Sequence, residues 1–506
     1  MRDRPVSTVL GIAGAKRNAC AAICIDGQIR AACEQERLTR VRGIGLAPGV
    51  LPLEAVDEVI ALAGRQPGDV TTYVSAEPQV RLPATLRIQA VDHHQGHAAA
   101  AFLSSPFERA VVLVCDTHPG RELSIWIGHG NHLANLDLPW SGRAFASLYS
   151  ECAELFDFAS GQSHRLEALA HLARGERTQE LTTTFQYIDG GLKVDADWCA
   201  HIDRMIQADR RRHGHAAETA SAVQCRIGEL LLEFLADVRA AVEVDALCLA
   251  GGLFYNTYFN TLIRASGLFS ESFVPINPGN AGLAVGASLV VANQDGVQSR
   301  PTVSPFLGPE YDLETIKATL DSCKLSYEFV TEAEAQDAAV AALVRGHLVG
   351  WFQGRMEWGH RALGHRSILA NPRCEYVLDN LNFFLRKRER SRPFGLSVCE
   401  DSVHKLFCGP PSSPWMEYEY RPRDDHFRHV IPGGASTIRV QTVAPDQGPF
   451  WALLKKMEQA TGVSAVVNTS FNGFHEPIVC SPRDAVRVFF GTGLDMLVIG
   501  RFVLKK

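Results

Sequence analysis

The chain has 506 residues, of which 46% are hydrophobic and 21% are charged, and its formal net charge is −6 at pH 7. These values are ordinary for globular proteins and provide enough apolar surface for two or three folded domains. The negative balance argues against a protein that coats nucleic acid, so any anion binding has to be local.

Cysteine usage and hydropathy favour a cytoplasmic protein without a membrane anchor. The 13 Cys include no Cys-x-x-Cys pair, and several lie in apolar runs, where a reduced buried thiol is the default. The first residues lack the long apolar region of a signal peptide. No run approaches roughly 18 apolar residues, the length that spans a membrane. We therefore expect a cytoplasmic enzyme of small-molecule metabolism.

The first 300 residues alternate apolar runs with helical patterns. The apolar runs predict strands at residues 7–13, 21–25, 29–33, 110–116, 122–128 and 246–250. Apolar residues at helical spacing, or small-residue runs, predict helices at about residues 53–63, 223–238, 255–265 and 282–292. Strand, hairpin and helix, followed by strand, Gly-Gly turn and helix, suggest a two-lobed α/β nucleotide-binding architecture. We see no internal repeat in the sequence.

The second half begins after a stretch rich in Pro and Ser at residues 299–309, which we interpret as a linker. The α/β pattern resumes from about residue 311, and residues 415–432 are polar and aromatic and predict irregular structure. In the first half, the basic run within residues 202–217 is expected to be a surface loop or a helix end.

The segment at residues 354–373, GRMEWGHRALGHRSILANPR, is the most informative stretch of the chain. Its arginines alternate with glycines: Arg355, Arg361, Arg366 and Arg373, with Gly354, Gly359 and Gly364 between them. Arginine grips phosphate or carboxylate through two parallel hydrogen bonds, and glycine lets backbone N–H groups approach an anion closely. We expect a loop that binds a phosphate-bearing substrate, with a solvated basic loop as the alternative. The apolar run at residues 348–352 predicts a buried strand that leads into it.

A second candidate site lies in the run VDHHQGHAAAAF at residues 91–102. His93 and His97 are four residues apart and share one face if this run is a helix. Two imidazoles at this spacing can bind one divalent metal, and Asp116, at the end of a predicted strand, could add a carboxylate. Such a set suits Fe(II), Zn or Mn, and the residues do not choose among them. The alternative is a histidine cluster used in packing, and we expect His94 to lie on another face.

Together these segments resemble the O-carbamoyltransferase family, which is typified by NodU and CmcH and includes the aminoglycoside carbamoyltransferases. In the second half the resemblance is carried by residues 350–373, 388–398, 438–443 and 466–500. In the first half it is carried by CEQERLTRVR at residues 33–42, HHQGHAAAAF at 93–102, LAGGLFYN at 249–256 and NPGNAGLAVGASL at 277–289. The matching segments keep the family's order over most of the chain.

The resemblance implies an α/β fold in two parts. Residues 1–300 would form an actin-like, two-lobed domain of the ASKHA class, similar to the tRNA threonylcarbamoyl transferases. Residues 301–506 would form a YrdC-like α/β domain. In the family the C-terminal domain makes carbamoyl adenylate from carbamoyl phosphate and ATP, and the N-terminal domain passes the carbamoyl group to an acceptor hydroxyl with the help of a metal. The resemblance thus implies ATP as co-substrate, Mg for the ATP, and Fe(II) as the metal.

The resemblance also assigns residues to these steps. The carbamoyl phosphate and ATP site would comprise Arg355, Arg361, Arg366, Arg388, Arg392, Arg439, Asn468, Ser470 and Asn472. Of these, the residues expected to act in catalysis are Arg355, Arg361, Arg388, Arg439 and Ser470. Several cations fit the chemistry, because forming an acyl adenylate brings two polyanions together. For any single arginine, an ordinary salt bridge is the alternative.

In the N-terminal domain the resemblance implies a metal site and a nucleotide-binding turn. The metal ligands would be His93, His97, Asp116 and Asn280. The turn would comprise Gly251, Gly252 and Asn256.

The chain departs from the family pattern mainly in this domain. Arg17 and Asn18 stand where the family has a His-Asp pair, Asn280 where it has an Asp, and Arg165 where it has a Lys. Asn keeps a carbonyl oxygen for a metal but loses the negative charge, which should weaken a hard-cation site. Either the transfer site is adapted to an unusual acceptor or metal, or the usual transfer step is lost. Three C-terminal departures should be tolerated: His360, Arg386 and Ser391.

The sequence thus predicts an ATP-dependent carbamoyltransferase whose acceptor is a hydroxyl, or alternatively an amine, of a small natural product such as an antibiotic. Two alternatives stay open: a related adenylating ligase with a different acyl group, and a nucleotide-binding protein with weak catalysis. The expected partners are carbamoyl phosphate, ATP and the acceptor, without nucleic acid or membrane, and a homodimer is the default.

Overall fold

The computed structural model describes residues 6–46, 50–77, 80, 88–118, 120–138, 140–297, 300–389 and 392–506. Ser391 and the start of the expected linker lie outside these ranges. Within them the chain is a mixed α/β protein, as the alternation of elements predicted. In the part of the chain that the structure describes, no helix is long and apolar enough to cross a membrane.

The chain divides into two compact units, and neither is continuous in the sequence. Unit 1 comprises residues 1–90, 303–431 and 436–506, and unit 2 comprises residues 91–302 and 432–435. The boundary after residue 302 lies beside the one expected after residue 300. The first 90 residues, however, group with the C-terminal half of the chain and not with the rest of the expected N-terminal domain. The division of function between a transfer domain and an adenylating domain stays a prediction.

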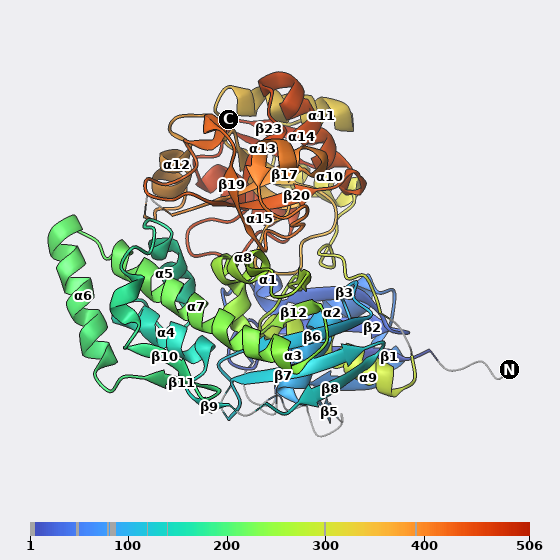
Figure 1. Ribbon diagram of the computed structural model, residues 1–506. Helices are drawn as coiled ribbons and strands as arrows, with labels where there is room; N and C mark the ends of the chain where they lie inside the picture. Colours follow the sequence, from blue (N-terminus) through green and yellow to red (C-terminus); the bar gives the residue numbers. More distant parts are fainter. Residues whose placement is uncertain are drawn as a thin grey trace. The chain divides into compact units, whose positions relative to one another are not determined.

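The first 90 residues form a five-stranded sheet within unit 1, drawn in blue in Figure 1. Its order is β3-β2-β1-β4-β5, with an antiparallel meander from β1 to β3 and with β4 and β5 added in parallel. The strands are β1 (Thr8–Ala13), β2 (Cys20–Ile25), β3 (Gln28–Glu34), β4 (Thr72–Ser75) and β5 (Ile88–Ala90). Helix α2 (Leu53–Leu62) covers the meander, because its buried residues recur at helical spacing and pack against Leu10, Ile12 and Ile23.

A ten-stranded sheet forms the rest of the framework of unit 1. Its order is β14-β23-β22-β15-β16-β21-β17-β20-β19-β18. The strands are β14 (Glu328–Phe329), β15 (Val349–Phe352), β16 (Arg366–Ala370), β17 (Gly395–Cys399), β18 (Phe407–Cys408), β19 (Glu419–Pro422), β20 (Ile438–Val443), β21 (Ala465–Ser470), β22 (Met496–Ile499) and β23 (Phe502–Lys505). The buried strand predicted before the arginine-rich segment is β15, so that prediction is confirmed.

Helices pack on this sheet through apolar stripes. On one face, Trp351 of β15 packs with Leu343 of α11 and Leu453 of α14 in one buried cluster. In addition to α2, the described α-helices of unit 1 are α1 (Gln35–Thr39), α10 (Leu313–Ser322), α11 (Glu332–Val344), α12 (Val377–Asp379), α13 (Val403–Leu406), α14 (Pro449–Thr461) and α15 (Pro482–Gly491). The 3-10 turns are η1 (Pro67–Asp69), η6 (Glu400–Ser402), η7 (Asp425–Phe427) and η8 (Pro445–Gln447), and η5 (Asn380–Leu385) is a short π-helix.

The segment at residues 415–432 is more regular than the sequence predicted, since it contains β19 and η7. Glu419 and Tyr420 are adjacent and both buried. The strand therefore lacks the alternation of buried and exposed residues by which a strand is recognised in a sequence.

Unit 2 contains a second five-stranded sheet, of order β13-β12-β6-β7-β8, and a small sheet, of order β10-β11-β9. The larger sheet comprises β6 (Arg109–Cys115), β7 (Leu123–His129), β8 (His132–Leu136), β12 (Ala246–Ala250) and β13 (Glu271–Phe273). The smaller comprises β9 (Ser141–Gly142), β10 (Phe185–Ile188) and β11 (Gly191–Val194). The hairpin predicted between the strands that became β6 and β7 is confirmed.

The two five-stranded sheets have the same topology. Each begins with three strands in an antiparallel meander, and each adds two later strands parallel to the first. In unit 2 the meander is β6-β7-β8 and the added strands are β12 and β13. The sequence shows no repeat, because the duplication lies in the order and direction of the strands and not in matching residues.

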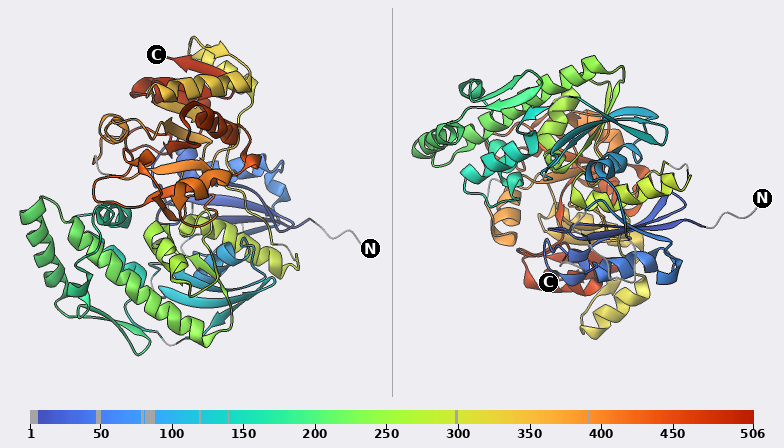
Figure 2. Two further views of the ribbon diagram at one scale, coloured as in Figure 1. Left: turned by 45° about the horizontal axis from the view of Figure 1, so that its top comes forward. Right: turned by 90° about the horizontal axis from the view of Figure 1, so that it is seen from below.

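Among the described residues, the longest helix is α7 of unit 2, which packs against α5 and α6 (Figure 2). The described helices of unit 2 are α3 (His93–Phe102), α4 (Phe145–Leu155), α5 (Ser163–Ala170), α6 (Trp198–His213), α7 (Ala217–Ala241), α8 (Thr257–Ser266) and α9 (Leu283–Gln294). The short turns are η2 (Thr178–Leu181), η3 (Gly252–Tyr255) and η4 (Asn280–Gly282). The basic run predicted at a helix end is the last turn of α6.

Helices α3 and α9 approach each other closely at two glycines. A Cβ atom built on Gly286 of α9 would lie 1.9 Å from the carbonyl oxygen of Gly96 in α3. This packing matters for function because α3 carries the candidate metal ligands His93 and His97.

The substitution Gly286→Ala should lower the free energy of unfolding by about 1–3 kcal/mol, because the added methyl group meets a backbone atom that moves only if α3 shifts. Urea denaturation of the full chain measures this. The control is Gly491→Ala, where a Cβ meets nothing within 4 Å and the change should stay within about 0.5 kcal/mol. Equal stabilities of the two variants would contradict the close contact.

Candidate functional site

The first candidate site lies in unit 2, where α3 begins and β6 ends. The side chain of Asp92 accepts the N–H of Gln95 at 2.8 Å and thereby fixes the start of α3 at His93. Nε2 of His93 lies 2.9 Å from Oδ2 of Asp116, and Nε2 of His97 lies 3.5 Å from the same oxygen. One ligand atom from each of these three residues lies within 4.8 Å of the others. The structure thus brings together three of the four residues predicted to ligate a metal.

The unpaired polar atoms of this site fit a divalent metal. Among the described residues, neither ring nitrogen of His97 has a hydrogen-bond partner, although both are buried, and Oδ1 of Asn280 is in the same situation. Buried polar atoms without partners are costly and rare, so they mark a place where a ligand is expected. Turn η4, which carries Asn280, contacts α3. The two imidazoles and the carboxylate suit Fe(II), Zn(II) or Mn(II).

The charges in this site are set by the neighbours of each group. Burial opposes ionisation of Asp116, but the contacts with His93 and His97 outweigh it and hold the pKa of that carboxyl well below its usual range. His94 lies apart from the trio: its Nδ1 is 2.6 Å from Oγ of Ser124, and burial, together with nearby positive charge, lowers its pKa to about 4. The prediction that His94 lies elsewhere is confirmed.

The Gly251-Gly252 turn lies beside Asp116. The N–H of Gly252 donates to Oδ1 of Asp116 at 3.4 Å. Gly251 has a φ of +98°, and a Cβ there would lie 2.0 Å from the carbonyl oxygen of Cys115. Only glycine fits such a conformation and such a close approach. The turn therefore borders the metal-ligand trio.

Asn256 was predicted to belong to the same turn. Its side chain makes hydrogen bonds to other residues of unit 2. Its Oδ1 accepts the N–H of Tyr258 at 3.0 Å and caps α8. Its Nδ2 donates to Oη of Tyr149 and to Oε1 of Gln224, both at 3.0 Å. The role of Asn256 in binding a nucleotide stays a prediction.

The second candidate site lies in unit 1 and begins with the arginine- and glycine-rich segment, which connects β15 to β16. A carboxylate of the segment itself organises it. Oε1 of Glu357 accepts three backbone N–H groups, from Leu363 at 2.8 Å, His365 at 2.8 Å and Arg366 at 3.0 Å. The sequence predicted that backbone N–H groups of this segment bind a substrate anion. In the structure these three N–H groups bind the carboxylate of Glu357 instead.

Arg355 and Arg366 of this segment bind backbone carbonyls. Arg366 is fully buried, donates to the carbonyls of Gln353 at 2.7 Å and Gly354 at 3.1 Å, and lies over the ring of Phe352. Arg355 donates at 2.8 Å to Leu307, at 3.3 Å to Gly308 and at 3.2 Å to Arg30. These bonds hold the loop in place, so the structure gives no support to the predicted contacts of Arg355 and Arg366 with phosphate.

A cationic cluster lies farther along the chain and comprises Arg386, Arg388, Arg392 and Arg439. Burial, followed by the charges of the other three arginines, lowers the pKa of Arg388 to about 8. Burial also lowers the pKa of Arg386 to about 9. Cations crowded in a buried place destabilise one another and favour the binding of an anion. The charges of Arg386, Arg392 and Arg439 thus all act on Arg388, and Glu389, which lies 4.0 Å from Arg392, offsets part of them. That Arg388, Arg392 and Arg439 bind substrate stays a prediction.

The loop after β21 joins this cluster through Arg386. Arg386 donates to Oδ1 of Asn472 at 2.6 Å and to the carbonyl of Ser470. Oγ of Ser470 donates to Oδ1 of Asn472 at 2.7 Å. Asn468 lies deeper: its Nδ2 donates to Oγ of Ser397 at 2.9 Å, and its Oδ1 is buried without a partner among the described residues.

Glu417 is a buried carboxyl group near Arg361. Its Oε2 accepts the hydroxyl of Ser413 and the N–H of Trp415, both at 3.0 Å. Burial raises the pKa of Glu417 to about 7, against the hydrogen bonds and the charge of Arg361, which favour the ionised form.

Sequence reasoning missed four residues of the two sites: Glu357, Arg386, Glu417 and His118. His118 stacks on His93, with ring centroids 3.9 Å apart, and stands two residues after Asp116. The usable signals were an acid inside a basic segment, for Glu357, and a histidine beside an expected ligand, for His118. Arg386 was noted only as a departure from a pattern, and Glu417 gave no signal, since its burial depends on the fold.

A cluster of cations, and three side chains that could hold a metal, are features found in enzymes that activate and transfer a group. The chain matches a family model described as the carbamoyltransferase N-terminus over residues 79–289, and one described as the carbamoyltransferase C-terminus over residues 340–506. The chain belongs to the carbamoyltransferase family and is a transferase.

Two relatives of the chain, one of which is named as a carbamoyltransferase, agree with this family. The chain is 30% identical to nodulation protein NolO of Bradyrhizobium diazoefficiens, over 82% of this chain and 79% of that protein. It is 27% identical to the 3'-hydroxymethylcephem-O-carbamoyltransferase of Amycolatopsis lactamdurans, over 61% of each chain. A solved structure of full-length HypF, in a phosphate- and nucleotide-bound form, shares 11% identity over 57% of this chain and 56% of its own, with a TM-score of 0.39. No conclusion rests on a likeness of that degree.

The substitution Glu417→Gln should change how stability depends on pH. In the folded chain the proton stays on Glu417 up to about pH 7, whereas the unfolded chain releases it near the ordinary value of 4.5. The stability from this group is therefore fully present below about pH 4.5 and is lost as the pH rises through about 7. Relative to the wild type, the variant should gain up to about 3 kcal/mol between pH 5 and pH 8.

Urea denaturation of both proteins at pH 5 and pH 8 measures the difference. Glu375→Gln, at an exposed carboxylate of the same unit, is the matched control and should show no such gain. A stability difference for Glu417→Gln that is the same at both pH values would contradict the assignment.

Proposed function

We propose that this carbamoyltransferase uses ATP to activate the carbamoyl group of carbamoyl phosphate as carbamoyl adenylate. The cationic cluster of Arg386, Arg388, Arg392 and Arg439 is the observation that carries the proposal. ATP and carbamoyl phosphate are both polyanions, and four crowded cations offset the repulsion between them when they meet. Overall, ATP, carbamoyl phosphate and water give carbamoyl adenylate, pyrophosphate and phosphate.

Residues around the cluster have separate tasks in this reaction. Arg388, Arg392 and Arg439 bind and neutralise the phosphate groups, and Arg361 adds a cation from the neighbouring loop. Ser470 and Asn472 are held by Arg386 and supply neutral polar groups at the edge of the cluster. Arg355 and Arg366 support the loop that carries Arg361, through their bonds to backbone carbonyls.

The second step transfers the carbamoyl group to an acceptor hydroxyl and releases AMP. His93, His97, Asp116 and the amide oxygen of Asn280 would hold a divalent metal, for which Fe(II) is our proposal, and Mg would accompany the ATP. When bound, such a metal supplies a Lewis acid that polarises a carbonyl group and stabilises negative charge on its oxygen. The Gly251-Gly252 turn lies beside Asp116, and Gly252 places no side chain there.

The fold that we propose for these steps follows the family. The two five-stranded sheets of equal topology support an actin-like, duplicated architecture of the ASKHA class. The ten-stranded sheet and its helices would be the YrdC-like part. The relative from Amycolatopsis lactamdurans supports a small natural product as the acceptor, with O-carbamoylation as the reaction.

The wild-type protein should release pyrophosphate from ATP only when carbamoyl phosphate is present, and Arg439→Ala should lower that rate by about a hundredfold or more, because it removes a cation at the developing charge. A coupled pyrophosphate assay measures both. Arg345→Ala, at an exposed arginine of the same unit, is the control and should keep the wild-type rate.

Two outcomes would count against the proposal. No pyrophosphate release by the wild type would refute the adenylation step. Release that requires another carboxylic acid in place of carbamoyl phosphate would favour the ligase alternative.

The substitution His97→Ala should abolish metal binding but leave pyrophosphate release near the wild-type rate, because the trio takes no part in adenylation. Elemental analysis after loading with Fe(II) or Zn(II) gives the metal content. His94→Ala removes an imidazole of the same helix that contacts Ser124 instead, and this control should keep the metal. Retained metal in His97→Ala, or an equal loss of adenylation, would show that the roles are assigned wrongly.

A further inference from the structure

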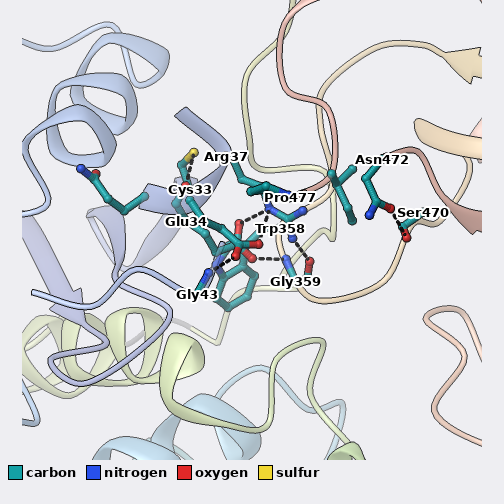
Figure 3. Close-up of polar contacts among 12 residues, drawn as sticks. Cys33, Glu34, Arg37, Gly43, Trp358, Gly359, Ser470, Asn472 and Pro477 are labelled. Atoms are coloured by element: carbon teal, nitrogen blue, oxygen red, sulfur yellow. Dashed lines mark hydrogen bonds and ion pairs between the residues drawn. The ribbon is translucent and has the colours of Figure 1, made fainter. Parts of the chain in front are cut away.

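The segment CEQERLTRVR at residues 33–42 is part of the sequence resemblance, but the proposed chemistry gives it no task. In the structure it forms the end of β3, helix α1 and the turn after it. All of it lies within unit 1, in the same compact unit as the arginine- and glycine-rich segment and the cationic cluster. Figure 3 shows the contacts of Glu34 and Arg37 with Gly359.

Glu34 and Arg37 grip both backbone groups of a single residue, Gly359. The N–H of Gly359 donates to Oε1 of Glu34 at 2.8 Å, and Nη2 of Arg37 donates to the carbonyl oxygen of Gly359 at 2.7 Å. The two side chains also pair with each other, Nε of Arg37 lying 3.6 Å from Oε2 of Glu34. Glu34 is only 5% exposed and Arg37 only 3%. Charge-assisted hydrogen bonds in so dry a place are strong and specific.

Gly359 needs such contacts to stay in one conformation. Its φ is +131°, a region that only glycine enters readily. Glycine also leaves that region readily, so the peptide groups around it are not fixed by local sterics. From the other side, Glu357 binds the N–H groups of Leu363, His365 and Arg366. The turn that carries Arg361 is thus held at Gly359 by the N-terminal segment and at its far end by Glu357.

Arg40, the residue that follows α1, binds a second loop of the proposed site. Arg40 donates to the carbonyls of Ile478 at 2.6 Å and Pro477 at 2.8 Å, and its Nε lies 3.3 Å from Oδ1 of Asp484. This loop begins at Asn472, whose Nδ2 donates to the carbonyl of Glu476 at 2.9 Å. Asn472 in turn accepts a hydrogen bond from Arg386 of the cationic cluster at 2.6 Å.

We propose that Glu34, Arg37 and Arg40 are positioning residues for adenylation: they fix, through backbone contacts, the two loops that present Arg361 and Asn472 to the nucleotide and carbamoyl phosphate. The inference rests on the proposed function for the identity of these substrates. It gives the first 90 residues, which the sequence assigned to the transfer step, a part in the adenylation step. None of the three touches the reacting atoms, so their effect passes through the loops.

The substitution Arg37→Met tests this in the full-length protein, because methionine fills similar space but donates no hydrogen bond. It should lower the kcat of pyrophosphate release by about ten- to a hundredfold, the effect of losing a charged hydrogen bond, with a smaller change in the KM for ATP. Arg345→Met, at the exposed arginine used as a control above, should leave kcat unchanged. A kcat for Arg37→Met equal to that of the control would overturn the proposal.

A second readout does not depend on catalysis. Backbone hydrogen exchange in the peptide of residues 354–366, followed by mass spectrometry, should be at least about tenfold faster in Arg37→Met than in the wild type and unchanged in Arg345→Met. Unchanged exchange in this peptide would overturn the positioning role. Glu34→Gln keeps an oxygen for the N–H of Gly359 but loses the charge, so its effects should lie between those of the wild type and Arg37→Met.

The two readouts separate the failure of this inference from the failure of the proposed function. A wild type without pyrophosphate release, with faster exchange in Arg37→Met, refutes the adenylation chemistry but upholds the control of the loop by α1. An active wild type, with unchanged exchange and kcat in Arg37→Met, refutes only the inference. If Arg37→Met does not fold, Glu34→Gln carries the same comparison, and wild-type behaviour in both readouts would overturn the proposal.

Discussion

The crowding of Arg386, Arg388, Arg392 and Arg439 is the constraint on which the rest of unit 1 depends. Four cations in a half-buried place repel one another and lose hydration, which is why the pKa of Arg388 falls to about 8. Such a cluster persists only on a rigid support. The ten-stranded sheet supplies it, since β20 carries Arg439 and pairs with β17, which begins three residues after Arg392.

Buried carboxylates give the loops around the cluster their shape. Glu357 binds three N–H groups of its own loop, and Glu34 binds the N–H of Gly359 from another part of the chain. A carboxylate also binds the turn after β1, because Glu77 accepts the N–H groups of Gly14 and Ala15. An internal anion that saturates backbone donors makes a glycine-rich loop rigid, because an unpaired buried donor is costly. Arg355 and Arg366 add to this rigidity through their bonds to backbone carbonyls.

The metal-ligand trio follows a different principle. Its residues come from the start of one helix and the end of one strand, and the glycine contact between α3 and α9 fixes the helix. Among the described residues, neither Nδ1 of His97 nor Oδ1 of Asn280 has a hydrogen-bond partner, although both atoms are buried, and such atoms mark a place where a ligand is expected. Asn280 offers an amide oxygen but carries no negative charge.

The sequence by itself determined the α/β class, nearly all the strands and helices tested, the family, and the pairing of His93 and His97 with Asp116. These follow from local periodicity, from spacing along one helix and from motifs that are contiguous in the chain. Only the tertiary structure decided which arginines bind backbone carbonyls and which crowd together, and that residues 1–90 group with the C-terminal half. Arg355 and Arg388 look alike in a sequence, because the carbonyls and cations that distinguish them come from residues far away in the chain.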